Sequence, residues 1–172
     1  RDSCPSCGAD LVVLAPGEIV GERYEIVSLL GRGGMGCVYR AHDRVLHDEV
    51  ALKVQRADAA REPHLARRFR NEVRLARQIT HPNVCRLYDG WQEGSCRWIS
   101  MELVDGKTLA ARLGDARPSS EEAWSLAVQA ADGLGAVHRA GVVHRDVKPL
   151  NLMVDAGGRV RLMDFGIAKP AA

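Results

Sequence analysis

Short runs of β-branched, aromatic and aliphatic residues, separated by turn residues, occupy much of the first half of the chain. Runs of this length with alternating side chains are typical of strands in a sheet. We predict strands at residues 24–30, 37–42, 49–55, 84–88 and 97–103. Two later runs, 152–154 and 160–163, flank Asp155-Ala156-Gly157-Gly158, and this arrangement predicts a β-hairpin.

A helical periodicity replaces the alternation between about residues 60 and 79. Apolar positions, with one carboxylate among them, recur there at spacings of four and three, which places them on one face of a helix. These positions are Leu65, Phe69, Glu72, Ala76 and Ile79. Five arginines lie largely off this stripe and are interpreted as a solvated face, with a docking site as the alternative. They are Arg67, Arg68, Arg70, Arg74 and Arg77.

A second helix is predicted to begin near Ser119, where Ser119-Ser120-Glu121-Glu122 forms a capping box, and to continue to about Arg139. The predicted order of elements is therefore several strands with one helix, followed by a second helix and a hairpin. This order predicts an α+β fold in two lobes.

The chain has 172 residues, 46% apolar and 27% charged, and its 24 basic and 22 acidic residues leave a net charge of +2. This length fits one domain, or a domain with a short extra module, and the composition excludes a disordered chain. The balance of charge argues against nucleic acid or an anionic membrane as a partner. No apolar stretch approaches the ~20 residues of a membrane span and no signal peptide is visible, so we expect a soluble, cytoplasmic chain. The first residue is Arg1 rather than Met, which leaves the natural start open.

Five cysteines without a secretory signal fit a reducing compartment. Cys37, Cys85 and Cys96 stand singly and are predicted to be small buried hydrophobic side chains. Cys4 and Cys7 form a CxxC followed by a glycine, and this spacing predicts half of a zinc ribbon. An inert N-terminal tail and a redox motif are the alternatives. Pro16-Gly17 marks the expected boundary of this 1–16 module.

Gly31-Arg32-Gly33-Gly34-Met35-Gly36 is a GxGxxG motif, which is a weak signal by itself. A dinucleotide-binding turn would open a helix, and a P-loop would end in Gly-Lys-Ser/Thr. Here a strand-forming run follows. The glycines are therefore predicted at the tip of a β-hairpin, where bare backbone can fold over phosphates.

Lys53 shares one face of a predicted strand with Ala51, because alternate residues of a strand point to the same side. A strand-end lysine is ordinarily solvated. However, Glu72 lies in the apolar stripe of the following helix, and a buried carboxylate needs a cationic partner. We therefore predict an ion pair between Lys53 and Glu72.

Two loops joined by the predicted hairpin carry polar groups that suit divalent metal and polyphosphate. One loop contains Asp146, Lys148 and Asn151, and the other contains Asp164-Phe165-Gly166. Asp and Asn supply hard oxygen ligands, and Lys neutralises a phosphoryl group. We interpret His144 as a structural histidine, because Asp146 is the better proton acceptor for a hydroxyl beside a phosphate.

In the order in which they occur, these motifs resemble the Hanks-type serine/threonine protein kinases, and Gly-Arg-Gly-Gly-Met-Gly-Cys-Val-Tyr-Arg-Ala resembles the bacterial members. The resemblance covers about residues 24–169. It implies a protein-kinase-like fold, with a complete N-lobe of antiparallel sheet and one helix (about 24–103) and a partial C-lobe (about 104–172). It also implies ATP and Mg²⁺ or Mn²⁺ as cofactors, and protein Ser/Thr hydroxyls as acceptors.

The resemblance also implies a role for each matching residue. Gly31, Gly33 and Gly36 would cover the phosphates, and Lys53, paired with Glu72, would hold the α- and β-phosphates. Asp146 would orient or deprotonate the hydroxyl, Lys148 would contact the γ-phosphate, and Asn151 and Asp164 would hold the metal. The adenine slot would take Leu30, Val38 and Ala51 as its roof, Met153 as its floor and Met101 as gatekeeper, with backbone hydrogen bonds from Glu102 and Val104. Arg145 would grip an activation-loop phosphate.

The sequence stops at Ala172, shortly after Asp-Phe-Gly, without a recognisable substrate platform. We therefore expect a fragment of a kinase whose full-length parent transfers phosphate. A non-catalytic ATP-binding module and a zinc-dependent interaction element are the rival interpretations.

Overall fold

The computed structural model describes residues 13–33, 36–56, 63–93 and 96–164. The chain divides into two compact units. The first comprises Arg1–Arg70 with Tyr88–Leu103, and the second Asn71–Leu87 with Val104–Ala172. The proposed zinc-binding pair, Cys4 and Cys7, lies outside the described residues.

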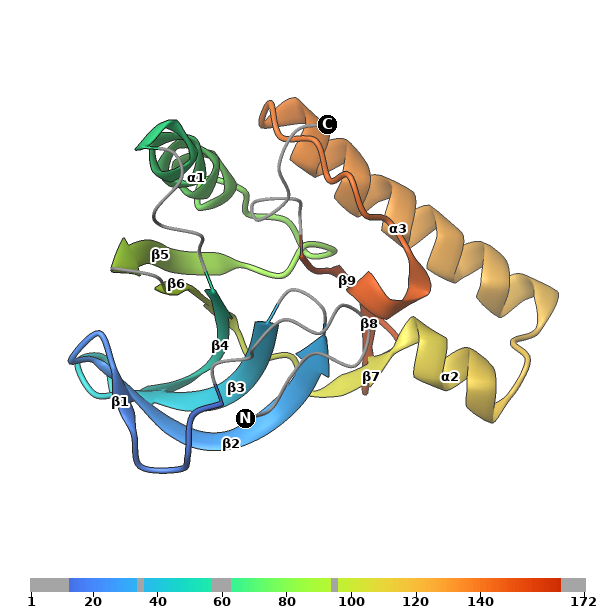
Figure 1. The fold of residues 1–172 in the computed structure, drawn as a ribbon. Helices are drawn as coiled ribbons and strands as arrows, with labels where there is room; N and C mark the ends of the chain where they lie inside the picture. Colours follow the sequence, from blue (N-terminus) through green and yellow to red (C-terminus); the bar gives the residue numbers. More distant parts are fainter. Residues whose placement is uncertain (1–12, 34–35, 57–62, 94–95, 165–172) are drawn as a thin grey trace. The chain divides into compact units, whose positions relative to one another are not determined.

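A six-stranded sheet forms the body of the first unit, in the order β1-β2-β3-β4-β6-β5 (Figure 1). Its strands are β1 (Ile19–Val20), β2 (Tyr24–Gly33), β3 (Gly36–Asp43), β4 (Asp48–Arg56), β5 (Leu87–Glu93) and β6 (Cys96–Glu102). The pairs from β1 to β4, and β4 with β6, are antiparallel. The strands predicted at 24–30, 37–42, 49–55 and 97–103 are confirmed.

The strand predicted at 84–88 was placed too early, because β5 begins only at Leu87. Val84 makes an isolated parallel bridge to Leu162, and the Cys85 N–H donates to the Leu162 carbonyl at 2.9 Å. The backbone of this β-prone segment is therefore used by the second unit and is not available to the sheet.

The core of the first unit lies on one face of the sheet, where alternate residues of neighbouring strands meet. Tyr24, Tyr39 and Leu52 are almost fully buried there, as is Cys37, which confirms its prediction. Cys85 is also buried, whereas Cys96 is only half-buried.

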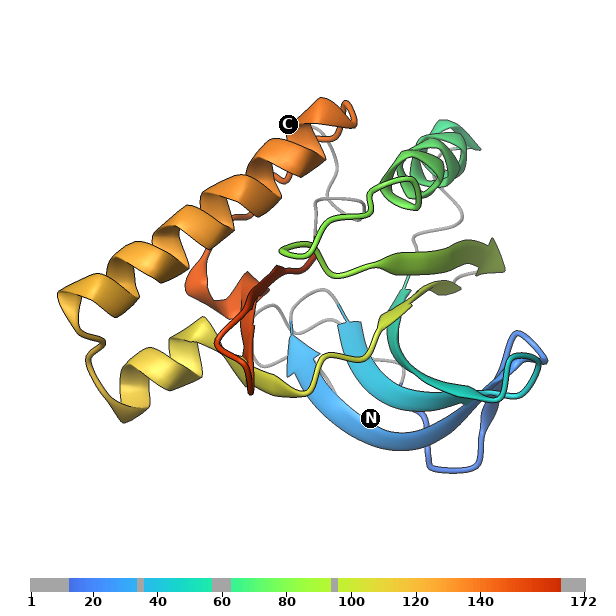
Figure 2. The same cartoon turned by 180° about the vertical axis from the view of Figure 1, so that it is seen from behind.

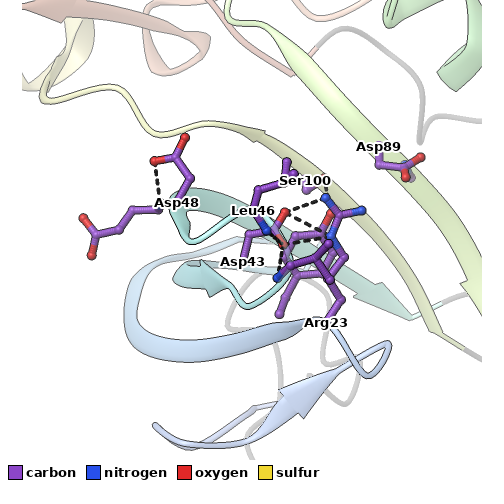
Figure 3. A network of polar contacts seen from close by, with 10 residues as sticks. Arg23, Asp43, Leu46, Asp48, Asp89 and Ser100 are labelled. Carbon is purple, nitrogen blue, oxygen red and sulfur yellow. Dashed lines mark hydrogen bonds and ion pairs between the residues drawn. The ribbon is translucent and has the colours of Figure 1, made fainter.

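A network of polar contacts lies where β2 begins and β3 ends (Figure 3). Arg23 holds the buried Asp43 through Nη2 and Oδ2 at 2.6 Å, and the Val45 and Leu46 N–H groups donate to Asp43 Oδ1. The Arg23 guanidinium therefore lowers the pKa of Asp43. Tyr24 Oη and Ser100 Oγ lie 3.0 Å apart in the same region, and burial raises the pKa of Tyr24.

Helix α1 (Pro63–Ala76) buries Phe69, Val73 and Ala76. The helix ends before Ile79, because the Gln78 and Ile79 N–H groups bond carbonyls three residues back and tighten the chain into a turn. Ile79 is nevertheless buried, as the apolar pattern predicts. The described arginine side chains that were predicted to be solvated are exposed. They are Arg67, Arg70, Arg74 and Arg77.

The second unit contains a three-stranded sheet, in the order β7-β8-β9, and two helices (Figure 2). Its elements are β7 (Gly106–Thr108), α2 (Leu109–Asp115), α3 (Ser120–Arg139), a 3₁₀ turn (Pro149–Asn151), β8 (Leu152–Asp155) and β9 (Val160–Leu162). The predicted hairpin and the predicted N-cap are confirmed, since Ser119 Oγ accepts the Glu122 N–H at 3.1 Å. The Glu122 carboxylate pairs with Arg112. In the described residues, no helix is long and apolar enough to span a membrane.

Hydrogen bonds of Asn83 and Gln129 connect helix α3 to the β8–β9 hairpin. The Asn83 amide donates to Gln129 Oε1 at 3.1 Å and to the Val160 carbonyl at 3.0 Å, and Gln129 Oε1 also accepts the Val160 N–H. Gly133 lets the two segments approach closely, since a Cβ on it would lie 2.5 Å from the Asn83 carbonyl oxygen. This contact fixes the strand that leads to Asp164.

Replacing Gly133 with alanine should therefore destabilise the chain, by about 1–3 kcal/mol in the free energy of unfolding, because backbone must move to admit the methyl group. Gly135→Ala is the matched control on the same helix, since its Cβ would meet only the flexible end of Arg139 at 3.4 Å. The higher helix propensity of alanine should make this control neutral or stabilising. Urea denaturation of both variants measures the difference, and equal stabilities would contradict the close approach.

Candidate active site

Strand register gathers several of the predicted nucleotide-binding residues on one face of the first unit. Gly31 pairs with Val38, Val38 with Lys53, and Lys53 with Ile99, so these four residues form one row across the sheet. Directly opposed residues of antiparallel strands point to the same side. The row therefore lies on the face opposite to the core that contains Tyr39 and Leu52.

The neighbouring row on this face contains Ala51 and Met101, which also pair directly. Lys53 and Ala51 are both buried, with 7% of their surfaces exposed, and Met101 is half-buried. A lysine that is this buried needs charge compensation. The predicted partner, Glu72, belongs to the second unit, and this pair stays a prediction.

The glycines of the loop differ in what the fold requires of them. Gly36 has a φ of +123°, and a Cβ there would lie 2.1 Å from the Val54 carbonyl oxygen, so the hairpin itself requires glycine. Gly31 and Gly33 have no such constraint, because a Cβ on either would meet nothing within 4 Å. Their bare backbone leaves open space in which a ligand can approach closely.

The remaining adenine-slot residues fall into both units. In the first, Leu30 is exposed at a register shift between Leu29 and Gly31, Val38 is half-buried, and Glu102 ends β6. In the second, Val104 and Met153 are half-buried, and Met153 pairs with Thr108 and Arg161.

The second unit joins Asp146, Lys148 and Asn151 in one network. Lys148 Nζ lies 2.9 Å from Asp146 Oδ2, and Asn151 Nδ2 donates to the Asp146 carbonyl at 2.8 Å and to Oδ2 at 3.1 Å. Asn151 is buried, whereas Lys148 keeps 44% of its side chain exposed. The carboxylate is thus oriented by a fixed amide, and the cation beside it remains accessible.

His144 fastens this loop to the strand that precedes Asp164. Its Nδ1 accepts the Asp146 N–H at 3.3 Å, so the neutral ring carries its hydrogen on Nε2, which donates to the Met163 carbonyl at 2.8 Å. The ring is 1% exposed, and burial lowers the pKa of His144. The prediction of a structural histidine is confirmed.

Because folded His144 resists protonation, it makes stability depend on pH. Below its ordinary pKa of 6.5 the unfolded chain binds a proton that the folded chain does not, so the free energy of unfolding should fall as pH decreases below this value. Urea denaturation across this range should show a weaker pH dependence for His144→Gln than for the unchanged chain. Identical slopes would contradict the burial of a neutral ring.

Two residues beside the network have backbone in the left-handed region, Arg145 with a φ of +62° and Asp164 with a φ of +56°. Such conformations cost about 1–3 kcal/mol each in non-glycine residues and persist where the surroundings impose them. The Met163 N–H donates to the Asn151 carbonyl at 2.9 Å, which holds the chain immediately before Asp164. Arg145 Nη1 lies 3.5 Å from Glu72 Oε1.

The donor set fits a divalent cation that is shared with a ligand. Both amide hydrogens of Asn151 are used on Asp146, so its Oδ1 remains as a hard oxygen, and Asp164 supplies a carboxylate. No group of three or more His, Cys, Asp or Glu side chains forms a metal site in the described segments. A cation held here would therefore complete its shell with oxygens from phosphates and water.

Sequence reasoning missed Met163 and Asn83, whose backbone and amide groups set the position of Asp164. Neither carried a signal, because Met163 acts through its main chain and Asn83 through a contact 77 residues away. Phe165 and Gly166 lie outside the described residues.

Comparison with known proteins shows what the chain as a whole is similar to. The protein kinase domain family matches residues 24–172. A probable serine/threonine-protein kinase of Streptomyces coelicolor is 43% identical over 155 residues, covering 87% of this chain and 23% of that protein. PknB of Mycobacterium leprae is 41% identical, covering 88% and 25%, and PrkC of Bacillus subtilis is 38% identical, covering 88% and 24%.

Among solved structures, the PknI kinase domain of Mycobacterium tuberculosis superimposes with a TM-score of 0.78 at 33% identity. The match covers 92% of this chain and 64% of that one. The chain spans about a quarter of the length of the curated relatives it matches. The predicted α+β kinase fold is confirmed, and the chain belongs to the protein kinase family.

Proposed function

We propose that this chain is the nucleotide-binding and catalytic-loop part of a serine/threonine protein kinase, which transfers the γ-phosphoryl group of ATP to a protein hydroxyl. The network of Asp146, Lys148 and Asn151 carries the proposal. A carboxylate with a fixed orientation beside an accessible cation suits proton acceptance from a hydroxyl that attacks a phosphate.

The face of the first unit would hold the nucleotide. Gly31 and Gly33 offer backbone N–H groups to the phosphates without side chains in the way, and Lys53 neutralises the α- and β-phosphates. Leu30, Val38 and Ala51 would cover the adenine, and Met153 is the residue of the second unit that the kinase family pattern assigns to the same base. Met101 would limit the depth of the slot, and the backbone of Glu102 and Val104 would bond the base.

In the transfer step, Asp146 accepts the proton of the attacking Ser or Thr hydroxyl while the bond from that oxygen to the γ-phosphorus forms. The bond to the β,γ-bridging oxygen breaks, and ADP leaves with the bonding pair. Lys148 neutralises the charge on the transferring group, and Asn151 keeps the Asp146 carboxylate in place. His144 stays neutral and keeps the loop in position.

Asn151 and Asp164 would hold Mg²⁺ or Mn²⁺ on the phosphates. The cation supplies electrostatic stabilisation of the charge that develops on them. Arg145 would bind an activation-loop phosphate, and we place the reaction in the cytoplasm.

Phosphoryl transfer from γ-labelled ATP to a protein acceptor, measured with the full-length parent, tests the proposal. Label on serine or threonine is expected. Binding of Mg·ATP without any transfer would instead favour a non-catalytic nucleotide-binding module.

We also propose that Cys4 and Cys7 form half of a zinc ribbon, which two further ligands must complete. Elemental analysis should find no tightly bound zinc in the 172-residue chain, and about one zinc per chain where a second ligand pair lies upstream. Stoichiometric zinc in the 172-residue chain would show that its own residues supply the other ligands.

A further inference from the structure

Helix α1 carries a row of arginines on the side that does not face the core. Arg67, Arg70 and Arg74 follow at spacings of three and four, which place them within about 60° of one another around the helix. All three are exposed, whereas Phe69, Val73 and Ala76 on the other side of the helix are buried. We call these three residues the arginine stripe.

The arginine stripe has no compensating charge on its own helix. Among the described residues, none of the three side chains forms a hydrogen bond or an ion pair. Glu72 is the single acidic residue in the sequence of α1, and its carboxylate bonds Arg145. Like charges three and four residues apart repel and destabilise a helix. Within the described residues, α1 therefore carries an unfavourable, accessible concentration of positive charge at this place.

We propose that the arginine stripe is a docking surface for an acidic segment of another protein, whose carboxylate or phosphate groups would bind the three guanidinium groups. Arginine binds either group through two parallel hydrogen bonds. From Arg67 to Arg74 the stripe spans about 10 Å. Alternate side chains of an extended segment repeat about every 7 Å, so two or three anionic residues match this length.

An acidic segment fits the stripe better than a membrane or a nucleic acid. A helix that binds a membrane surface inserts apolar side chains into it, but Phe69, Val73 and Ala76 are already used in the core of this protein. Nucleic-acid binding rests on an extended basic field, whereas the whole chain has a net charge of only +2. The positive charge of the arginine stripe is instead confined to three residues that span about 10 Å. The proposal does not depend on phosphoryl transfer.

The test is fluorescence anisotropy of the 172-residue chain with two labelled peptides. One alternates glutamate with glycine, and the other replaces the glutamates with phosphoserine, so that carboxylate and phosphate are compared directly. Binding is expected at about 50 mM salt, and it should weaken strongly at about 200 mM, because exposed charges are screened. A peptide with glutamine in the charged positions should not bind.

Three variants locate the binding. Arg67→Gln, Arg70→Gln and Arg74→Gln, introduced together, should lower affinity at least about tenfold, and the corresponding lysine triple should keep most of it. A matched control removes three other exposed arginines, Arg44, Arg117 and Arg159, and should change affinity less than about twofold. Glutamine is close to arginine in helix propensity. The stripe variant should therefore fold, with a higher melting temperature at low salt because the repulsion is gone.

Three results would overturn the proposal. The first is that neither peptide binds at low salt. The second is that the control variant loses as much affinity as the stripe variant, because this would indicate general charge attraction. In the third, anionic vesicles or a single-stranded oligonucleotide bind through the stripe while both peptides fail to bind.

Discussion

Replacing Asp146 with asparagine in the full-length kinase is expected to lower kcat for phosphoryl transfer by about 10²-fold or more, with little change in Mg·ATP affinity. Asp146 is the carboxylate that the network places beside Lys148, at 2.9 Å from its ammonium nitrogen. Asparagine retains the shape and an oxygen for the Asn151 amide, but it cannot accept the proton. Single-turnover transfer and titration calorimetry measure the two quantities separately.

Asp132→Asn is the control, since Asp132 is exposed on α3. This substitution removes the same charge at a position outside the network. Asp164→Asn provides the opposite comparison. It should weaken metal-dependent nucleotide affinity as well as rate, because this carboxylate is proposed to hold the cation. If Asp146→Asn loses nucleotide binding while Asp164→Asn keeps it, the two roles are reversed.

Replacing Lys53 with methionine should lower the rate of phosphoryl transfer by about 10²-fold or more and also weaken Mg·ATP binding. Lys53 is 7% exposed and lies in the same row as Gly31 and Val38, so its ammonium group is a buried cation on the face that is proposed to hold the phosphates. Methionine matches the length of the side chain and tolerates burial. The sheet should therefore remain intact while the charge is lost.

Lys107→Met is the matched control, because Lys107 is largely exposed and pairs with Asp115 on the surface of the second unit. Calorimetry with the 172-residue chain measures the affinity for Mg·ATP. An assay of the full-length protein measures the rate of phosphoryl transfer. Equal activity of Lys53→Met and the unchanged protein would refute the assignment of this face to ATP.

Local sequence patterns were sufficient for most elements of the fold. Alternation predicted the strands around Lys53, and Ser119 and the Asp155–Gly158 turn predicted a helix start and a hairpin, because these signals act between near neighbours. The same reasoning missed β7 and α2, which begin at Gly106 and Leu109. β7 is a three-residue strand that pairs with β8 almost fifty positions later, and α2 buries no residue, so neither has a strong pattern of its own.

Residue types and their spacing determined which side chains could perform chemistry here: a glycine-rich turn before a strand, one lysine facing inward, and two loops with carboxylates and an amide. Tertiary structure decided how they are held. Register brought Gly31, Val38 and Lys53 into one row, and His144 and Asn151 fixed Asp146 and Met163 through hydrogen bonds to the main chain. Side-chain identity is local information, whereas register, burial and main-chain partners arise only when distant segments pack together.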